Sequence, residues 1–571
     1  MSVSGVSQSG LREALLDTNP ATAFDPFLNF DAHNTSEARA RVYVTRHNSG
    51  EYELPIGYLT INGNLFDLPA GPVSFAIGGE YDAPKWTLDP DSLNTTFQSI
   101  TSSYGQGARV NRDVWSIYQE VRIPFTSPTW NFPGFYSFEV DFAEREEWYS
   151  QNTSAVLPSE VFPAQPAAHT QFNAQKPKVS VRWQPLDPKY VGALTLRGSY
   201  TEAFHAPALS EISPASSNSQ AFSGSFDPIL HTSYAFETRV IGNPNLQPEV
   251  AYEWSYGAVY SPKWLKGLTL SADWWHIDMR SIASLLGTQF IIDNNIPGLV
   301  IRAPPVSPGR PGPIILVIDP NENLTGAIFE GLDYQTSYIL DSSIFGHGDF
   351  GRLTATVNGT WLSRAELQIS PNTKRFGIAG EFIPPGFTLT GSLQWNRANS
   401  SLFYDGPADT WMQGLDVGAI VHYTGQYEDD NVSLTSAGGF LVPPKPQTPR
   451  SGPLPFRARK VREWITLDLI ASYTFNLPMT SVAEVPGFAK DGGKNVEMKG
   501  GKEKDVMPLS AAEYGCNNWK WWLNNTTISL GMQNVLDEDP PFVANASENG
   551  YDESLATIKG RFWYVQLKKR F

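Results

Sequence analysis

The feature that most constrains the fold is a strict alternation of apolar and polar residues in long runs. From Leu353 to Trp361, apolar side chains and one glycine occupy every second position, and Thr or Asn occupies the positions between them. Successive side chains of a β-strand point to opposite faces, so this pattern predicts a strand with one apolar and one polar face. The pattern recurs at Leu389–Trp395 and Ile528–Met532. The chain is therefore predicted to be all-β.

The alternating runs predict fifteen strands spread along the chain. Many are much longer than the roughly 5–6 residues of ordinary globular strands, as expected of tilted strands that cross a bilayer. The predicted strands are 51–66, 72–87, 110–125, 134–150, 176–186, 193–205, 249–262, 267–281, 327–341, 351–366, 386–397, 411–427, 463–477, 525–537 and 560–571.

The connections between these strands alternate between short and long. Short connections at 67–71 and 262–267 contrast with long ones at 206–248, 282–326 and 428–462. A soluble β-sandwich has no reason to alternate in this way, whereas short periplasmic turns and long outer loops are typical of a transmembrane antiparallel β-barrel. Segment 478–524 is the exception, because a turn is expected there. Its Gly, Lys and Glu content predicts a solvated insertion on the periplasmic side.

Composition narrows the possible partners and compartments. The net charge of −16 makes nucleic acid an unsuitable partner, since phosphate binding needs a basic surface. The sequence contains no run of about 18 apolar residues, so it predicts no transmembrane helix. Cys516 is the single cysteine, so no internal disulfide is possible, and we expect an inert thiol. The first residues lack the cationic and apolar regions of a signal peptide. Trp264 and Trp411 near strand ends suit an interfacial girdle, with core packing as the alternative.

Segment Ile241–Glu249 is the most distinctive motif in the chain. Asn-Pro and Gln-Pro bias Asn243 and Gln247 toward extended backbone, which leads the chain into the next strand. The segment resembles the barrel of TonB-dependent outer-membrane receptors. That resemblance rests on Phe204 and Pro207 before a long loop, on Asn243, Pro244, Leu246, Pro248 and Glu249 after it, and on Asp273 and Trp274 at the end of the next hairpin.

The C-terminus adds a second match to the same family. Asn534 and Asp537, followed by Arg561, correspond to the last two strands of such barrels. The final strand ends on Phe571 and resembles the signal by which outer-membrane barrels are recognised for assembly. Lys569 departs from the pattern, since the family has an aromatic or apolar residue there; a lysine at the membrane rim can snorkel.

The resemblance implies a transporter in the cell outer membrane and no enzymatic activity or cofactor. Such receptors close about 22 strands around a plugged lumen. They take up scarce nutrients such as ferric siderophores, cobalamin or oligosaccharides. The implied partners are outer-membrane lipid, the inner-membrane TonB complex through the N-terminal part, and the barrel assembly machinery through the C-terminal strand.

The resemblance covers residues 52–571 and lies in the barrel. The first predicted strand ends in a short turn, so it runs from outside to periplasm and must have an even number. Counting back from the C-terminus makes it the eighth of about 22 strands. We therefore expect 51–571 to be a barrel portion without the plug and first seven strands, and 1–50 to be a remnant of the preceding barrel region.

Candidate ligand contacts lie in the long loops, where Phe222, Tyr234 and Tyr427 supply aromatic side chains. His205 and His276 are the histidines that we single out for ligand contact. The chain has no histidine pair at metal-ligand spacing, so no metal site is predicted.

Two acidic groups have plainer explanations than chemistry. Glu144, Glu146 and Glu147 could form a carboxylate pair for glycoside hydrolysis, but a charged strand rim explains them. Asp429 and Asp430 could bind calcium, but a solvated acidic surface is the favoured explanation. The alternative function is a soluble or surface-attached all-β protein that binds or modifies carbohydrate through its tryptophans. It leaves the alternating connections and Phe571 unexplained.

Overall fold

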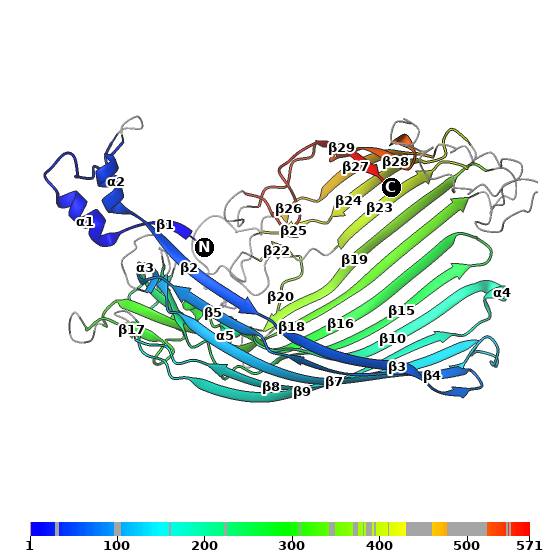
Figure 1. The fold of residues 1–571 in the computed structure, drawn as a ribbon, viewed down its shortest axis with the longest axis horizontal. Helices are drawn as coiled ribbons and strands as arrows, with labels where there is room; N and C mark the ends of the chain where they lie inside the picture. The colour runs from blue at the N-terminus through cyan, green and yellow to red at the C-terminus, as the bar shows by residue number, and fades with distance from the viewer. Residues whose placement is uncertain are drawn as a thin grey trace, which may run out of the picture.

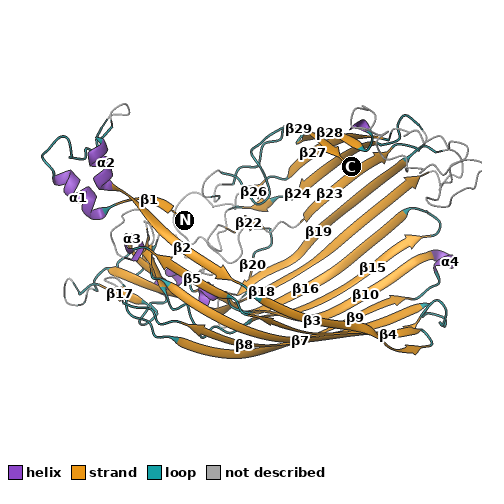
Figure 2. Cartoon of the chain, in the orientation of Figure 1, coloured by secondary structure: helices purple, strands orange, loops and turns teal. Residues whose placement is uncertain are grey.

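One curved, mainly antiparallel sheet dominates the chain (Figures 1 and 2), and among the described residues its strands β3 (Ile56–Leu68) and β29 (Phe562–Lys569) each pair on one side alone. The fold is that of a computed structural model, which describes residues 2–28, 33–95, 104–158, 162–221, 225–305, 307, 309, 311–341, 349–368, 375–380, 382–383, 391–392, 396–408, 410–429, 460–476, 522–543, 546 and 550–570. Among these residues, no helix has the length and apolar character needed to cross a membrane.

Fifteen strands follow one another through this sheet, each antiparallel to the next, and we call them the wall. The number predicted from alternation is confirmed. The wall strands are β3 (Ile56–Leu68), β4 (Gly71–Asp82), β7 (Ala108–Thr126), β8 (Ser137–Thr153), β9 (Ala168–Gln184), β10 (Gly192–His205), β15 (Glu249–Pro262), β16 (Leu268–Leu285), β18 (Ile314–Asp341), β19 (Arg352–Gln368), β23 (Asn396–Asp405), β24 (Leu415–Thr424), β27 (Trp464–Phe475), β28 (Thr526–Gln533) and β29 (Phe562–Lys569).

The two ends of the wall differ in their connections. We call the end with the short β3–β4 and β15–β16 connections the turn end, and the end with segments 206–248 and 286–313 the loop end. Because the wall has an odd number of alternating strands, its edge strands β3 and β29 run in the same direction. These two edges therefore cannot pair antiparallel with each other.

The two faces of the wall differ in chemistry, as the alternation predicts. On the apolar face, Tyr256, Trp274, Leu332 and Trp361 occupy paired positions on four successive strands. On the polar face, Arg197 forms an ion pair of 2.6 Å with Asp273. Each face is continuous because side chains of a strand alternate strictly between the two.

The N-terminal elements extend the sheet at the loop end. α1 (Gln8–Leu16), α2 (Ser36–Val42) and α3 (Ser92–Thr95) accompany β1 (Ser2–Val6), β2 (Tyr43–Glu53) and β5 (Lys85–Pro90). β1 pairs with β2, and β2 pairs with β5. β2 begins only at Tyr43, because α2 continues to Val42. The domain division at residue 50 stays a prediction.

A second layer of structure folds at the loop end. β14 (Phe236–Ile241) pairs in parallel with residues 316–320 of β18, and helix α6 (Thr288–Asp293) packs beside them through the buried Ile291 and Ile292. This layer contains β6 (Tyr104–Gly105), β11 (Ser216–Ala221), β14 (Phe236–Ile241), β17 (Val300–Arg302), α5 (Leu209–Ile212) and α6 (Thr288–Asp293). The remaining elements are α4 (Pro188–Val191), β12 (Phe226–Asp227), β13 (Thr232–Ser233), β20 (Phe376–Gly377), β21 (Phe382–Ile383), β22 (Gly391–Ser392), β25 (Tyr427–Glu428) and β26 (Lys460–Val461).

Several predicted strand boundaries are wrong. β9 begins at Ala168 instead of 176, and β18 begins at Ile314 instead of 327. The strand expected to end at 397 continues as β23 (Asn396–Asp405), which pairs with β19 over its full length. Alternation continues beyond 397 and does not mark where pairing ends. The strand expected at 72–87 is divided into β4 and β5 around Pro84, which has no N–H to donate to a ladder. Most of 386–397 and of the 478–524 insertion, together with Cys516 and Phe571, lies outside the described residues.

Candidate functional site: a charged groove on the polar face

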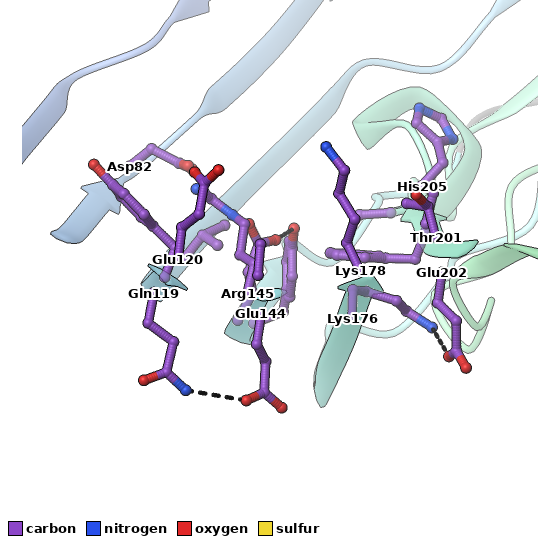
Figure 3. A pocket seen from close by; sticks show the side chains of 18 of the residues that line it. Asp82, Gln119, Glu120, Glu144, Arg145, Lys176, Lys178, Thr201, Glu202 and His205 are labelled. Carbon is purple, nitrogen blue, oxygen red and sulfur yellow. Dashed lines mark hydrogen bonds and ion pairs between the residues drawn. The ribbon is translucent and has the colours of Figure 1, made fainter. Parts of the chain in front are cut away.

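A groove of about 660 Å³ crosses the polar face of the wall, with its upper part at the loop end (Figure 3). Strands β4, β7, β8, β9 and β10 line it. The ladder registers place Glu120, Lys178 and Thr201 in one row across the sheet, with Ala143 between the first two. Charged residues at alternate positions of these strands thus meet on one face. That spacing is present in the sequence, but alternation within single strands did not single it out.

The centre of the groove is held by a network of paired charges around Arg145. Its guanidinium donates to Glu80 at 3.2 Å and to Ser116 at 3.1 Å, and it also binds Glu147. The Tyr149 hydroxyl donates to the same Glu147 carboxylate. Glu147 is buried, so the charge of Arg145 compensates a carboxylate that has lost its water.

Arg112 connects the upper end of the groove to the loop end. Its guanidinium donates to Gln151 Oε1 at 2.8 and 3.1 Å and to the Pro207 carbonyl at 2.6 Å. The residue is 7% exposed. Arg112 thus fixes the start of the 206–248 segment against β7 and β8. Its Cζ lies 5.7 Å from the Tyr149 ring, which also meets Phe204 edge-on at 5.8 Å.

Three charged groups of the groove lack a carboxylate or cation in contact. In the part of the chain that the structure describes, the side chains of Lys178 and Asp82 have no hydrogen bond or ion pair, and the Arg112 side chain bonds only to neutral acceptors. At longer range, Arg112 acts electrostatically on Asp82, and Lys178 acts on Glu120. Figure 3 shows Lys178 and Glu120 pointing to one side, whereas Gln119 and Glu144 point to the other. The groove can therefore offer unpaired charges of both signs to a polar ligand.

The histidines and loop aromatics singled out in the sequence have different surroundings. His205 lines the groove, and its Nδ1 lies 3.6 Å from Oε2 of Glu249. His276 lies on the apolar face, 2.8 Å from Glu330. Tyr427 is 4% exposed inside a small cluster. Phe222 is outside the described residues. A role of these aromatics in ligand contact stays a prediction.

Glu144 and Glu147 do not assemble a hydrolytic pair. Glu144 and Glu147 lie on opposite faces of β8, and Glu144 accepts a hydrogen bond from Gln119 at 3.1 Å. Asp429 is fully buried, so the solvated acidic surface expected there is wrong for this residue, because β25 and its neighbours enclose it. Across the described ranges, no group of three or more potential ligand residues could hold a metal ion.

Asp227 organises the loop end above the groove. Its carboxylate is 1% exposed and accepts hydrogen bonds from Arg302 at 2.7 and 2.9 Å and from the Tyr234 hydroxyl at 2.6 Å. Burial raises the pKa of Asp227, but hydrogen bonds from Arg302, Tyr234 and two backbone N–H groups outweigh it and hold the pKa at about 2. Tyr234 also accepts from the Ile314 N–H, which makes it part of the loop framework.

The Asn243–Glu249 motif ties the loop end to the wall. Asn243 donates to the Asn321 carbonyl and accepts from the Asn245 N–H, which closes a local turn. Leu246 is 2% exposed in a hydrophobic cluster, and the Glu249 carboxylate accepts from the Ala283 N–H at 2.9 Å. Pro244 and Pro248 lie within the same segment. The motif has a clear structural role.

The C-terminal motif forms a comparable turn between β28 and β29. Asn534 and Asp537 adopt positive φ, and the Asn534 amide bonds both backbone groups of Glu538. The Asp537 carboxylate accepts from the Arg561 N–H at 2.8 Å, and Arg561 Nε donates to the Val535 carbonyl. Asn and Asp tolerate this left-handed backbone better than other residues with side chains.

Comparison with solved structures gives remote likenesses to whole receptors. The siderophore receptor PirA of Acinetobacter baumannii is 14% identical, with a TM-score of 0.43 over 91% of this chain and 63% of that one. The ferric enterobactin receptor PfeA of Pseudomonas aeruginosa is 14% identical, with a TM-score of 0.46 over 91% of this chain and 62% of that one. The hemophore receptor HasR of Serratia marcescens is 13% identical, with a TM-score of 0.45 over 92% of this chain and 60% of that one. The chain spans less than two thirds of these receptors.

A comparison with curated proteins returns no match. The family model described as "TonB dependent receptor-like, beta-barrel" matches residues 8–487, which is most of the chain. The wall and its two chemically distinct faces agree with that match. The chain therefore belongs to the family of TonB-dependent receptor-like β-barrels.

Proposed function

We propose that the wall forms part of an outer-membrane receptor that binds a scarce nutrient and imports it with energy from the inner-membrane TonB complex. The family places the chain in the outer membrane. The observation that carries the binding role is the groove, where the side chains of Lys178 and Asp82 make no hydrogen bond or ion pair within the described residues and lie on the face opposite the apolar one.

The difference in chemistry between the two faces of the wall supports this role. Val565 and Leu567 of β29 are 74% and 71% exposed on the apolar face, as suits contact with lipid. The groove lies on the other face, which a closed barrel would enclose. A soluble carbohydrate-binding protein would leave such apolar rows in water, so the outer-membrane role is favoured.

Transport through the wall depends on pairing of its two edge strands, β3 and β29. Since β3 and β29 run in the same direction, antiparallel closure requires an odd number of further strands between them. Unpaired backbone groups at an edge inside hydrocarbon would cost several kcal/mol each, so closure is a condition for a stable lumen. We propose that import requires this closed form, with the TonB complex and the barrel assembly machinery as partners.

The ligand classes that we propose are ferric siderophores, cobalamin and oligosaccharides. The solved receptors named above act on siderophore or heme-related ligands by their titles, and they make ferric siderophores the first class to test. A groove with unpaired charges of both signs suits ligands that carry several polar groups.

The test is uptake by cells that carry the receptor containing this chain. Radiolabelled ferric siderophores, cobalamin and maltooligosaccharides would be compared with and without the inner-membrane energy source. We expect energy-dependent uptake of one class, and a loss of about tenfold or more when Lys178→Gln and Asp82→Asn are combined. The matched control is Lys266→Gln in the β15–β16 turn, which should leave uptake unchanged. Energy-dependent uptake that the groove variant does not alter would refute the site but not the transporter.

A further inference from the structure

The connection between β7 and β8 at the turn end has an unusual composition. From Ile123 to Phe138 the chain contains no Asp, Glu, Lys or Arg and is rich in Phe, Trp and Pro. By contrast, the β15–β16 connection at the same end carries Lys263 and Lys266, and the β9–β10 connection carries Asp187. Turns in water usually present charged or polar side chains, so this segment does not fit an aqueous surface.

The backbone of this connection satisfies much of its hydrogen bonding internally. Ser127 pairs with Trp130, and Phe132 pairs with Phe135, through isolated bridges. The Asn131 side chain donates to the Ser127 carbonyl at 3.2 Å and to the Pro128 carbonyl at 2.9 Å. A turn that satisfies its own backbone can enter a poorly hydrated environment at low cost.

The aromatic side chains lean onto the apolar face of the wall. The ring centroid of Phe135 lies 5.8 Å from that of Phe138 and 5.5 Å from that of Trp183. Trp183 Nε1 donates a hydrogen bond to the Gly134 carbonyl at 2.9 Å. Phe138 and Trp183 are paired positions on β8 and β9. They share their face with the apolar residues of those strands, so the turn continues the lipid-facing surface past the end of the sheet.

Two further aromatic side chains of this turn remain uncovered. Trp130 is 47% exposed and Phe132 is 50% exposed, and Phe125 at the base of the turn is 48% exposed. Phe132 packs 5.2 Å from Phe135 and therefore extends the same aromatic cluster. Trp and other aromatic residues are favoured where hydrocarbon meets lipid headgroups.

We propose that the segment from Ser127 to Tyr136 is a membrane anchor, which places Trp130 and Phe132 at the boundary between headgroups and acyl chains of the leaflet at the turn end. The occupant of this surface is lipid because the cluster continues the apolar face without a break and carries no charge. The anchor would fix the depth of β7 and β8, which carry the groove residues Arg112 and Arg145.

The test uses site-specific fluorescence of the receptor containing this chain in phosphatidylcholine vesicles, so that the sheet edges are paired. In a Cys516→Ser background, Trp130→Cys is labelled with bimane and exposed either to nitroxide-labelled phosphatidylcholine or to iodide in the buffer. Leu530→Cys on the apolar face is the control for lipid contact. Lys266→Cys in the charged β15–β16 turn is the control for water contact.

We expect nitroxide lipid to quench the label at 130 nearly as strongly as the label at 530, and iodide to quench it at least threefold less than at 266. Equal iodide quenching at 130 and 266 would overturn the proposal. Protection of position 130 from both quenchers would also overturn it, because a protein surface would then cover the turn. Lack of lipid quenching at 530 would overturn the bilayer placement of the wall, and the anchor with it.

Discussion

The wall and the loop end of this protein differ in how their apolar side chains are removed from water. In the wall, apolar side chains such as Leu530 and Val565 are 56% and 74% exposed, and they depend on the bilayer to remove them from water. At the loop end, Ile291 and Val317 are fully buried against neighbouring loop residues. The loop end therefore has its own hydrophobic core, as a soluble domain does.

This difference has a consequence for the groove. The upper end of the groove depends on Arg112, which bonds the Pro207 carbonyl at the start of the loop-end layer. A loop end with a fixed core keeps that carbonyl, and His205 beside it, in a defined position. Substitutions that open the loop core should thus affect ligand binding without disturbing the wall.

The largest effect is expected when the buried ion pair of the loop end is broken. Asp227→Ala leaves the guanidinium of Arg302 buried without its carboxylate, and such losses cost about 3–5 kcal/mol. Protection of α6 amides from hydrogen exchange should fall accordingly, while amides of the wall keep theirs. The double variant Asp227→Ala with Arg302→Met should recover part of the loss. Equal loss of protection in wall and loop end would contradict their independence.

A smaller effect is expected from a charge on the apolar face of the wall. Val357→Arg should destabilise the folded protein in lipid by about 2–4 kcal/mol if the residue faces the centre of the bilayer. Asn358→Arg, one residue along and on the exposed polar face, should cost less than about 1 kcal/mol. Urea unfolding in vesicles measures both. Similar costs for the two substitutions would mean that the apolar face does not meet lipid.

The pH dependence of the loop end should follow Asp319, which lies in the part of β18 that pairs with β14. Burial raises the pKa of Asp319 to about 6, although Gly287 and Leu286 donate backbone hydrogen bonds to it. The folded pKa lies above the unfolded value, so this contribution to stability is fully present below pH ~4 and is lost as pH rises through 6.

The variant Asp319→Asn tests this sign. It keeps an acceptor for the Gly287 N–H but removes the buried charge, so α6 should gain on the order of 2 kcal/mol of local stability at pH 8 relative to the parent chain. Below pH ~4 the two proteins should be alike. Hydrogen exchange of α6 across this range is the measurement, and a parent chain whose protection rises with pH would refute the assigned direction.

The sequence predicted the wall much better than the groove. Alternation is a local property, so Leu353 to Trp361 could be assigned to a strand with defined faces. The continuation of β23 to Asp405 could not be assigned, because it depends on pairing with β19, where Asp405 lies opposite Arg352. Loop packing likewise depends on contacts far apart in sequence, and for that reason the burial of Tyr427 was not foreseen.

The groove was missed because its members are separated in the chain and gathered by register. Lys178 and Glu120 lie in one row only through the pairing of each with Ala143 of β8. A register shift of one residue would send either side chain to the other face. Patterns of single strands cannot supply that information.

The smallest effect is expected at the turn end of the wall, from the exposed ion pair between Arg352 and Asp405. Their side chains lie 3.4 Å apart and are 57% and 45% exposed. Water screens such a pair and its side chains lose mobility when they meet, so Arg352→Gln should change stability by less than about 1 kcal/mol. Unfolding in vesicles at low and high salt measures this change. The pair has the same chemistry as Asp227 with Arg302, and a cost comparable to that of the buried pair would show that solvent exposure does not account for the contrast between the two ends.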